Sequence, residues 1–178
     1  MRRTILLLLA ALCALVLIGP AQAAPRAKKA EPPPVKVTGA RVLEFGTYTS
    51  TVEHREKSPA VADGIKDRAT DFRLVRKSTL VAASLGTGIG LSYMLLGTPK
   101  GASVTLEVSV SHPAMLNLET RETMTRSSAS YERVLGEPAH AVWSFDTQAG
   151  LVPGEYVIEL MYEGRVLAKK EFRVTVRR

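Results

Sequence analysis

The C-terminal stretch from Ala141 to Val176 constrains the fold of this 178-residue chain more than any other part of it. It contains three runs in which apolar and polar residues alternate, separated by short polar segments. Such an alternation is typical of strands with one buried face. Pro153 and Gly154 open the second run and suit a type II turn, because proline presets φ and glycine accepts a positive φ. The stretch therefore predicts three consecutive antiparallel strands.

The break at residues 163–165 predicts a hairpin. The length of its loop can be chosen by asking which side chains each choice places opposite each other. A two-residue loop would place apolar residues opposite charged ones. We therefore expect a three-residue loop with Gly164 or Arg165 left-handed. That choice buries matching faces by pairing Tyr156 with Phe172 and Leu160 with Ala168.

Two residues of this stretch are expected on the inner side of the sheet. Trp143 shares a face with Ala141 and Phe145, so the single tryptophan is predicted to lie in the core. Lys170 also falls on the inward side, and we expect it at the end of the sheet or at a bulge.

Further strands are expected upstream, and no stretch has a helical pattern. The clearest is Val104–Val110, where valine and leucine alternate with threonine, glutamate and serine. Segments 53–71 and 114–137 are polar or irregular, so we expect a loop in the first and a loop with one strand near Tyr131–Leu135 in the second. These features predict an all-β, immunoglobulin-like antiparallel β-sandwich of about seven to eight strands.

The uncharged stretch Ser78–Pro99 allows three interpretations. It is long enough for a transmembrane helix at Leu80–Leu96, but its glycine, serine and threonine residues dilute the apolar character. The glycines at 86, 88 and 90 do not have the spacing of a dinucleotide-binding loop, and no helix is predicted after them. We therefore expect two strands joined near Gly86, the second covering Ile89–Leu96.

The N-terminus has the three parts of a secretory signal peptide. A basic start is followed by an uncharged apolar run from Ile5 to Ile18 and by the small residues Ala21 and Ala23. We expect cleavage after Ala23, which removes the only cysteine, so the mature chain would form no disulfide. The expected organisation is a signal peptide at 1–23, a linker rich in proline and lysine at 24–34, and a β-sandwich domain at 35–178. The expected location is the periplasm or the exterior.

The charge of the chain is basic without being concentrated. There are 24 lysine and arginine residues against 17 aspartate and glutamate residues. No dense basic run with interleaved aromatic residues is present, so no nucleic-acid partner is predicted. Another envelope protein or an anionic envelope polymer is the partner that this charge favours.

No constellation of catalytic or metal-binding residues is visible in the sequence. The three histidines, His54, His112 and His140, are not spaced as a zinc site, although the last two could converge across strands. The carboxylate pairs are spaced like solvated surface residues, namely Glu119 with Glu122 and Glu155 with Glu159. We therefore predict no catalytic residue, no metal ligand and no cofactor-binding residue, and no cofactor.

The glycine segment 86–93, the strand that ends at His112-Pro113, and the tail motifs from Trp143 to Val174 resemble a bacterial family, the domain of unknown function number 3859. The resemblance covers roughly Val37 to Val176, and Ile89 stands where an aromatic residue is expected. It implies an envelope-associated β domain and supplies no catalytic residue. The Pro-Gly-x-Tyr turn at 153–156 is also similar to that of immunoglobulin-like and macroglobulin-like sandwiches.

Three functional hypotheses follow from these expectations. The first is a non-catalytic interaction or structural module of the bacterial cell envelope, exported through the cleaved leader. The second is an envelope hydrolase, with a site built from residues 53–71 and 114–137. The third is a membrane-anchored protein that spans the bilayer at Leu80–Leu96.

Overall fold

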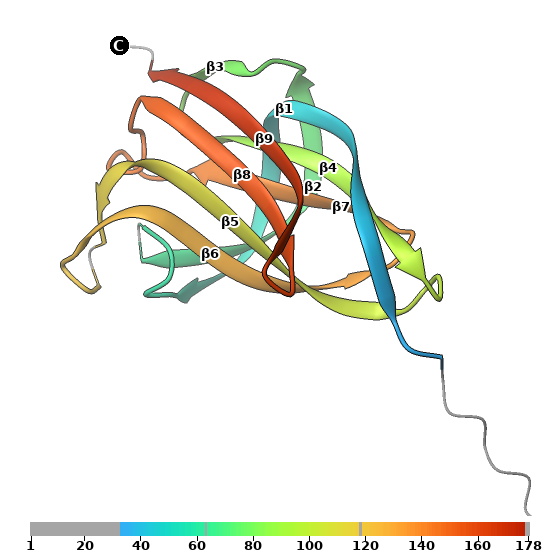
Figure 1. Ribbon diagram of the computed structural model, residues 1–178. Coiled ribbons are helices and arrows are strands. Elements are labelled where there is room, and N and C mark those ends of the chain that lie inside the picture. The colour runs from blue at the N-terminus through green and yellow to red at the C-terminus, as the bar shows by residue number, and fades with distance from the viewer. Residues whose placement is uncertain (1–32, 63, 118, 177–178) are drawn as a thin grey trace, which may run out of the picture. The chain divides into compact units, whose positions relative to one another are not determined.

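The computed structural model describes residues 33–62, 64–117 and 119–176. The predicted signal peptide and all but the last two residues of the predicted linker lie outside these ranges. The described residues form nine strands in two sheets (Figure 1). The strands are β1 (Lys36–Lys57), β2 (Ile65–Arg76), β3 (Leu80–Ala83), β4 (Thr87–Thr98), β5 (Ser103–Leu116), β6 (Thr123–Val134), β7 (Pro138–Phe145), β8 (Gly154–Tyr162) and β9 (Arg165–Val176).

The two sheets contain four and five strands. Their orders are β2-β1-β4-β7 and β3-β9-β8-β5-β6, and every pair is antiparallel except β3 with β9. The pair β4–β7 in one sheet and the neighbours β5, β8 and β9 in the other match strands B and E, and C, F and G, of an immunoglobulin domain. The predicted sandwich is confirmed, with nine strands in place of seven to eight.

A tyrosine hydrogen bond supports the same assignment. The hydroxyl of Tyr156, near the start of β8, donates to the carbonyl of Val152 at 2.8 Å. A tyrosine that bonds to the backbone just before strand F is the tyrosine corner of immunoglobulin-like sandwiches. The fold is therefore immunoglobulin-like, and the described residues contain no cysteine that could join its sheets by a disulfide.

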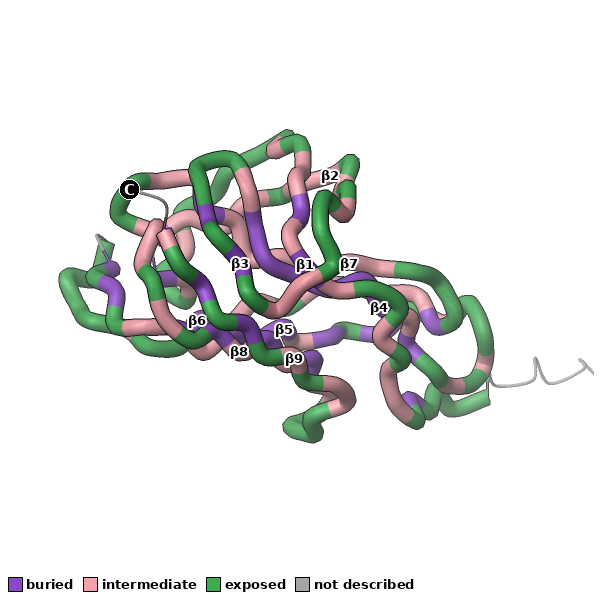
Figure 2. Tube along the Cα trace, turned by 90° about the horizontal axis from the view of Figure 1, so that it is seen from above, coloured by how far each residue is buried: buried purple, intermediate pink, exposed green. Residues whose placement is uncertain are grey.

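The core lies between the sheets and comes mainly from the alternating strands (Figure 2). The predicted inner faces of β5 and β8 are confirmed: Leu106, Ile158 and Leu160 are fully buried. Burying a side chain of this size contributes about 1.5–3 kcal/mol. The predicted core residue Trp143 is only half-buried, because it stands at the edge of the core on β7.

The β8–β9 hairpin has the predicted pairs and a different loop. Tyr156 lies opposite Phe172, and Leu160 opposite Ala168, as expected. The prediction of a three-residue loop is wrong, because Tyr162 pairs with Arg165 and only two residues turn the chain, both with positive φ. A bulge one pair further along the strands takes up the extra residue.

Lys170 faces inward opposite Ile158, as predicted. It lies neither at the sheet's end nor at the bulge. Its ammonium group lies 3.5 Å from the centroid of the Phe45 ring, so a cation–π contact satisfies the charge.

Both segments expected as loops are largely strand. Residues 53–57 continue β1 and residues 65–71 belong to β2, so the prediction of a loop over 53–71 holds only for the turn between them. In 114–137, β5 runs on to Leu116 and β6 covers Thr123–Val134, so the strand expected near Tyr131–Leu135 is present but begins earlier, at Thr123. The loop predictions failed because β2 contains no buried residue and β6 only Ser127, so neither has a regular apolar face.

The uncharged stretch 78–99 forms β3 and β4, as expected. Within the described residues, no helix is long and apolar enough to cross a membrane.

The glycines of β4 allow the neighbouring strand β7 to approach closely. A Cβ on Gly90 would lie 2.5 Å from the carbonyl oxygen of Ala141.

Candidate functional site: a groove on the open side of the sandwich

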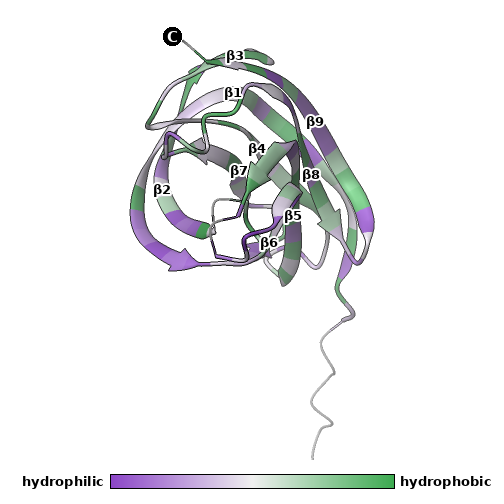
Figure 3. Cartoon of the chain, turned by 90° about the vertical axis from the view of Figure 1, so that its left-hand side faces the viewer, coloured by the Kyte–Doolittle hydropathy of each residue, from purple (hydrophilic) through white to green (hydrophobic). Residues whose placement is uncertain are grey.

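The long strand β1 shapes the site because it pairs with two different strands along its length. Its first half pairs with β4 and its second half with β2, so β2 is carried away from the rest of its sheet. An open groove of about 980 Å³ lies on this side of the sandwich, lined by β2, β6 and β7, with β5 behind them. β2 is largely hydrophilic, in contrast to the central strands (Figure 3). Its polar composition therefore fits a position facing solvent.

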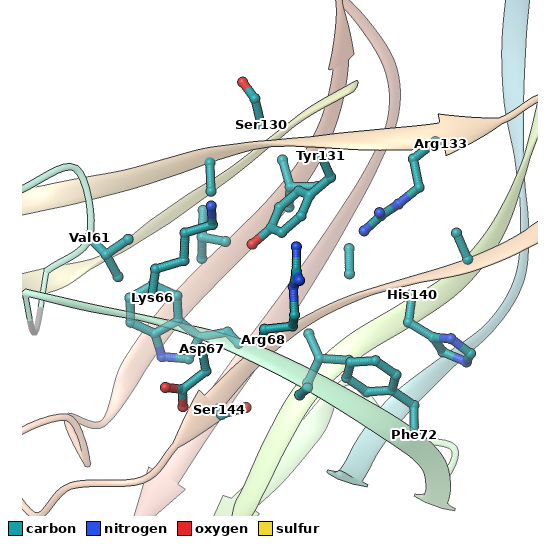
Figure 4. A pocket seen from close by; sticks show the side chains of 18 of the residues that line it. Val61, Lys66, Asp67, Arg68, Phe72, Ser130, Tyr131, Arg133, His140 and Ser144 are labelled. Atoms are coloured by element: carbon teal, nitrogen blue, oxygen red, sulfur yellow. The ribbon is translucent and has the colours of Figure 1, made fainter. Parts of the chain in front are cut away.

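Cationic side chains surround a tyrosine in the middle of the groove. Lys66 and Arg68 extend from β2 toward Tyr131 on β6, and Arg133 lies beside it (Figure 4). The Lys66 ammonium lies 5.5 Å and the Arg133 guanidinium 4.7 Å from the centroid of the Tyr131 ring. Burial raises the pKa of Tyr131, and the two cations oppose that effect. The ring is therefore a neutral platform between positive groups.

Arg133 is held in place by the core. Its Nε donates to the hydroxyl of the fully buried Tyr93 at 3.0 Å, and its Nη1 donates to the carbonyl of Glu132 at 2.8 Å. The side chain of Arg68 makes no hydrogen bond or ion pair with any described residue, and Glu56 is the carboxylate whose pKa its charge helps to lower. The groove thus combines one fixed cation with one that is available to a ligand.

An aromatic cluster forms the rim of the groove near the start of β7. The ring of His140 stacks on Phe72 from β2, with centroids 4.9 Å apart, and meets the edge of Tyr48 from β1 at 5.9 Å. Burial lowers the pKa of His140, and Arg133 acts in the same direction, while Glu44 opposes them. This cluster joins β2 to the rest of its sheet across the outer face of β4.

The turn between β1 and β2 closes one end of the groove. This turn, residues 58–64 with 63 outside the described set, is called the strap below. The backbone N–H of Ala62 donates to Ser127 Oγ at 2.9 Å, and the amide of Asn117 donates to Val61 O at 2.8 Å. The N–H of Ser128 donates to Ala60 O at 3.1 Å. These bonds attach the strap of one sheet to β6 of the other and to Asn117, the residue that follows β5.

The two histidines considered for a metal do not come together. His112 is buried, with Nε2 2.9 Å from Ser127 Oγ and Nδ1 2.8 Å from Pro113 O, whereas His140 lies in the aromatic rim. Within the described ranges no three histidine, cysteine, aspartate or glutamate side chains gather as a metal site. His54 is exposed at the border of the groove.

Three of the four carboxylates noted in the sequence, those of Glu119, Glu155 and Glu159, lie in surface ion pairs. Glu119 pairs with Lys57 at 2.9 Å and Glu155 with Arg173 at 2.8 Å. Glu159 pairs with Arg126 at 3.2 Å. Each of these three carboxylates faces a cation of a neighbouring segment, which suits a structural role.

Sequence reasoning considered a site between segments 53–71 and 114–137, but it did not single out the cations and the tyrosine at the centre of the groove. Lys66 and Arg68 are two apart, as are Tyr131 and Arg133, so each pair lies on one face of its strand. That spacing is the signal that could have found them. It carried no weight for Lys66 and Arg68, whose segment was predicted as a loop, because side-chain direction follows from spacing only once the strand is recognised.

The fold and the groove define an immunoglobulin-like sandwich with an open cationic side. The chain belongs to a family described as a domain of unknown function, DUF3859, whose sequence pattern matches residues 36–174. The resemblance seen in the sequence is thereby confirmed.

Solved structures give two further similarities. An immunoglobulin-like protein from Pseudomonas aeruginosa is 20% identical, covers 80% of this chain and 98% of its own, and has a TM-score of 0.49. The alkylpurine DNA glycosylase of Pseudomonas fluorescens, bound to DNA containing an abasic site analogue, is 16% identical with a TM-score of 0.35. That match covers 74% of this chain and 30% of the glycosylase. No curated protein matches the chain.

Proposed function

We propose that this protein is a non-catalytic interaction module of the bacterial cell envelope and that it binds its partner in the groove. The observation that carries the proposal is the open hollow of about 980 Å³ between β2, β6 and β7. Binding sites on sandwich domains commonly use edge strands and connecting segments. The partner is an envelope protein or an anionic envelope polymer, and no nucleic-acid partner is proposed.

The state of the ionisable groups supports binding over catalysis. The groove does lie between segments 53–71 and 114–137, where a hydrolase site was considered. Its carboxylate Glu56 pairs with Lys66 at 2.9 Å, and this hydrogen bond and charge lower the pKa of Glu56. The imidazole of His112 is occupied on both nitrogens. A general acid or base needs a free group with a pKa near the working pH.

Photo-crosslinking in cells tests whether the groove is the contact surface. A photoreactive residue at Ala69, which lines the groove on β2, is compared with one at Thr105, exposed on β5 and absent from the lining. Crosslinked adducts with the partner are expected when the photoreactive residue is at position 69 and not when it is at position 105. The same adducts from both positions would contradict a groove-directed interaction.

Export is the second part of the proposal, and it is supported by the basic start, apolar run and small-residue end of residues 1–23. Intact mass measurement of the protein released from the periplasm or medium is expected to give a chain beginning at Ala24. A cytoplasmic protein that retains its first 23 residues would overturn this part.

A further inference from the structure

The groove contains an unpaired strand edge, and this observation deepens the proposed function, on which the inference below rests. β6 is the last strand of its sheet and pairs only with β5 among the described strands. The N–H of Ser128 donates to Ala60 of the strap, so the backbone groups of Ser128 point away from β5. Pairing between β5 and β6 is regular from Arg126 to Val134. Because backbone direction alternates along an antiparallel strand, Ser130 and Glu132 also direct their N–H and C=O groups away from β5.

Both ends of this free edge are closed by the chain itself. The strap occupies the N–H of Ser128 at one end. At the other end the carbonyl of Val134 accepts from the N–H of Glu137 at 3.3 Å. The open edge between them, residues 129–133, spans about 17 Å at the usual rise of a strand. That length suits one short strand of about five residues.

The charges next to this edge favour an acidic strand. Lys66, Arg68 and Arg133 converge on Tyr131, whereas Asp67 points the opposite way and pairs with Arg55 at 3.2 Å (Figure 4). Glu56 also lines the groove and pairs with Lys66 at 2.9 Å, which leaves Arg68 and Arg133 as the cations without a carboxylate partner in an ion pair. The remaining acidic lining residues lie away from the centre. Glu132 is on the opposite face of β6 from Tyr131 by strand alternation, and Glu137 and Asp146 flank the two ends of β7.

We propose that the groove binds an extended acidic peptide, which adds to β6 through the backbone of Ser130 and Glu132 and places its carboxylates beside Arg68 and Arg133. Strand addition supplies the affinity through main-chain hydrogen bonds, and side chains supply the specificity. A polysaccharide or polyphosphate could meet the cations, but it has no row of N–H and C=O groups to match the edge. Arg68 contributes most to recognition, because Lys66 is paired with Glu56 and Arg133 is bonded to Tyr93, whereas no hydrogen bond or ion pair holds the Arg68 guanidinium among the described residues.

Binding is measured by fluorescence anisotropy on the purified protein with four labelled peptides of about seven residues. The first alternates glutamate with valine and threonine, the second has lysine in place of glutamate, and the third has glutamine there. The fourth keeps the glutamates but carries N-methyl groups on alternate backbone nitrogens. We expect the first to bind at least about tenfold more tightly than each of the others, since both a charge and a backbone match are required.

Two variants test whether the carboxylates of the acidic peptide are recognised by a cation in the groove. Arg68→Gln is expected to weaken the acidic peptide at least about fivefold and to leave the glutamine peptide unchanged. Arg73→Gln is the matched control, because Arg73 is exposed on the same strand and does not line the groove. Its binding is expected to equal that of the wild type.

The outcomes separate this inference from the proposed function. Equal binding of the acidic peptide and its N-methylated form would overturn strand addition and leave a simple anion site. If no peptide binds while Ala69 still gives specific adducts in cells, the inference fails and the groove remains the contact surface. If both peptides and adducts are lacking, the proposed function fails as well.

Discussion

At the residue scale, Asn117 has the largest set of side-chain hydrogen bonds near the groove. Its Nδ2 donates to Val61 O at 2.8 Å and to Pro59 O at 3.3 Å, while its Oδ1 accepts from the N–H groups of Glu119 and Thr120. The side chain is fully buried. Asn117→Asp keeps the acceptor and removes both donors to the strap. We expect a loss of about 2–4 kcal/mol in the free energy of unfolding, measured with urea.

The control for Asn117 is Thr120→Ala, which removes an exposed hydroxyl from the same turn. Its effect is expected to stay below about 0.5 kcal/mol. Hydrogen exchange gives a local readout, because the amides of Ala62 and Ser128 bond across the strap contact and should exchange faster in Asn117→Asp. Equal losses in the two variants would refute a special role for Asn117.

Tyr156 illustrates how a single hydroxyl contributes to a sandwich without disulfides. Tyr156→Phe keeps the ring, which meets the edge of Phe145 at 5.9 Å, and removes the bond to Val152. We expect a loss of about 0.5–1.5 kcal/mol in urea unfolding, the usual net value of one hydrogen bond. Tyr162→Phe, at the end of β8, is expected to leave the midpoint close to that of the wild type. A smaller effect at Tyr156 than at Tyr162 would count against the tyrosine corner.

At the element scale, β4 depends on the absence of side chains where β7 packs against it. A Cβ at Gly90 would lie 2.5 Å from Ala141 O and 2.6 Å from a methyl group of Val142. Gly90→Ala is therefore expected to cost about 1–3 kcal/mol through overpacking. Gly39→Ala is the control, because nothing lies within 4 Å of its added Cβ, and thermal unfolding should show little change or slight stabilisation. Two equally stable variants would remove the close-approach explanation.

The strands of the core could be predicted from sequence because their faces differ. In β8 and β9 the match of apolar faces determined the pairing of Tyr156 with Phe172. It could not determine the loop, because a two-residue turn with a bulge gives the same pairing as a three-residue turn without one. Register is thus encoded in side chains, whereas bulge position depends on backbone geometry.

The strands of the groove could not be predicted in this way. β2 has no buried residue, and β6 has only Ser127, because the faces of these strands meet solvent or the open groove. The strap contact that holds β2 near β6 depends on Asn117 and Ser127, which are distant from it in sequence. A site built from edge strands therefore lacks the periodic signal by which strands are recognised.

At the scale of the whole molecule, acid is expected to destabilise the domain through the aromatic rim. Burial lowers the pKa of His140 below its ordinary value of 6.5, so the unfolded chain binds the proton more tightly than the folded one. The contribution of His140 to stability is therefore fully present above about pH 6.5 and is lost as the pH falls through the lower folded value. Protonation places a charge between Phe72 and Tyr48, which join β2 to its sheet.

The measurement is the free energy of urea unfolding at a series of pH values from about 8 to 5, for the wild type and His140→Phe. The substitution keeps a ring to stack on Phe72. At pH 8 the difference in free energy of unfolding between the wild type and His140→Phe therefore reports the change in packing alone. Below pH 6.5 the wild type should lose stability more steeply than the variant, because only the wild type takes up this proton on unfolding. Parallel curves would mean that His140 is equally protonated in both states. The attachment of β2, and with it the shape of the groove, would then be independent of pH over this range.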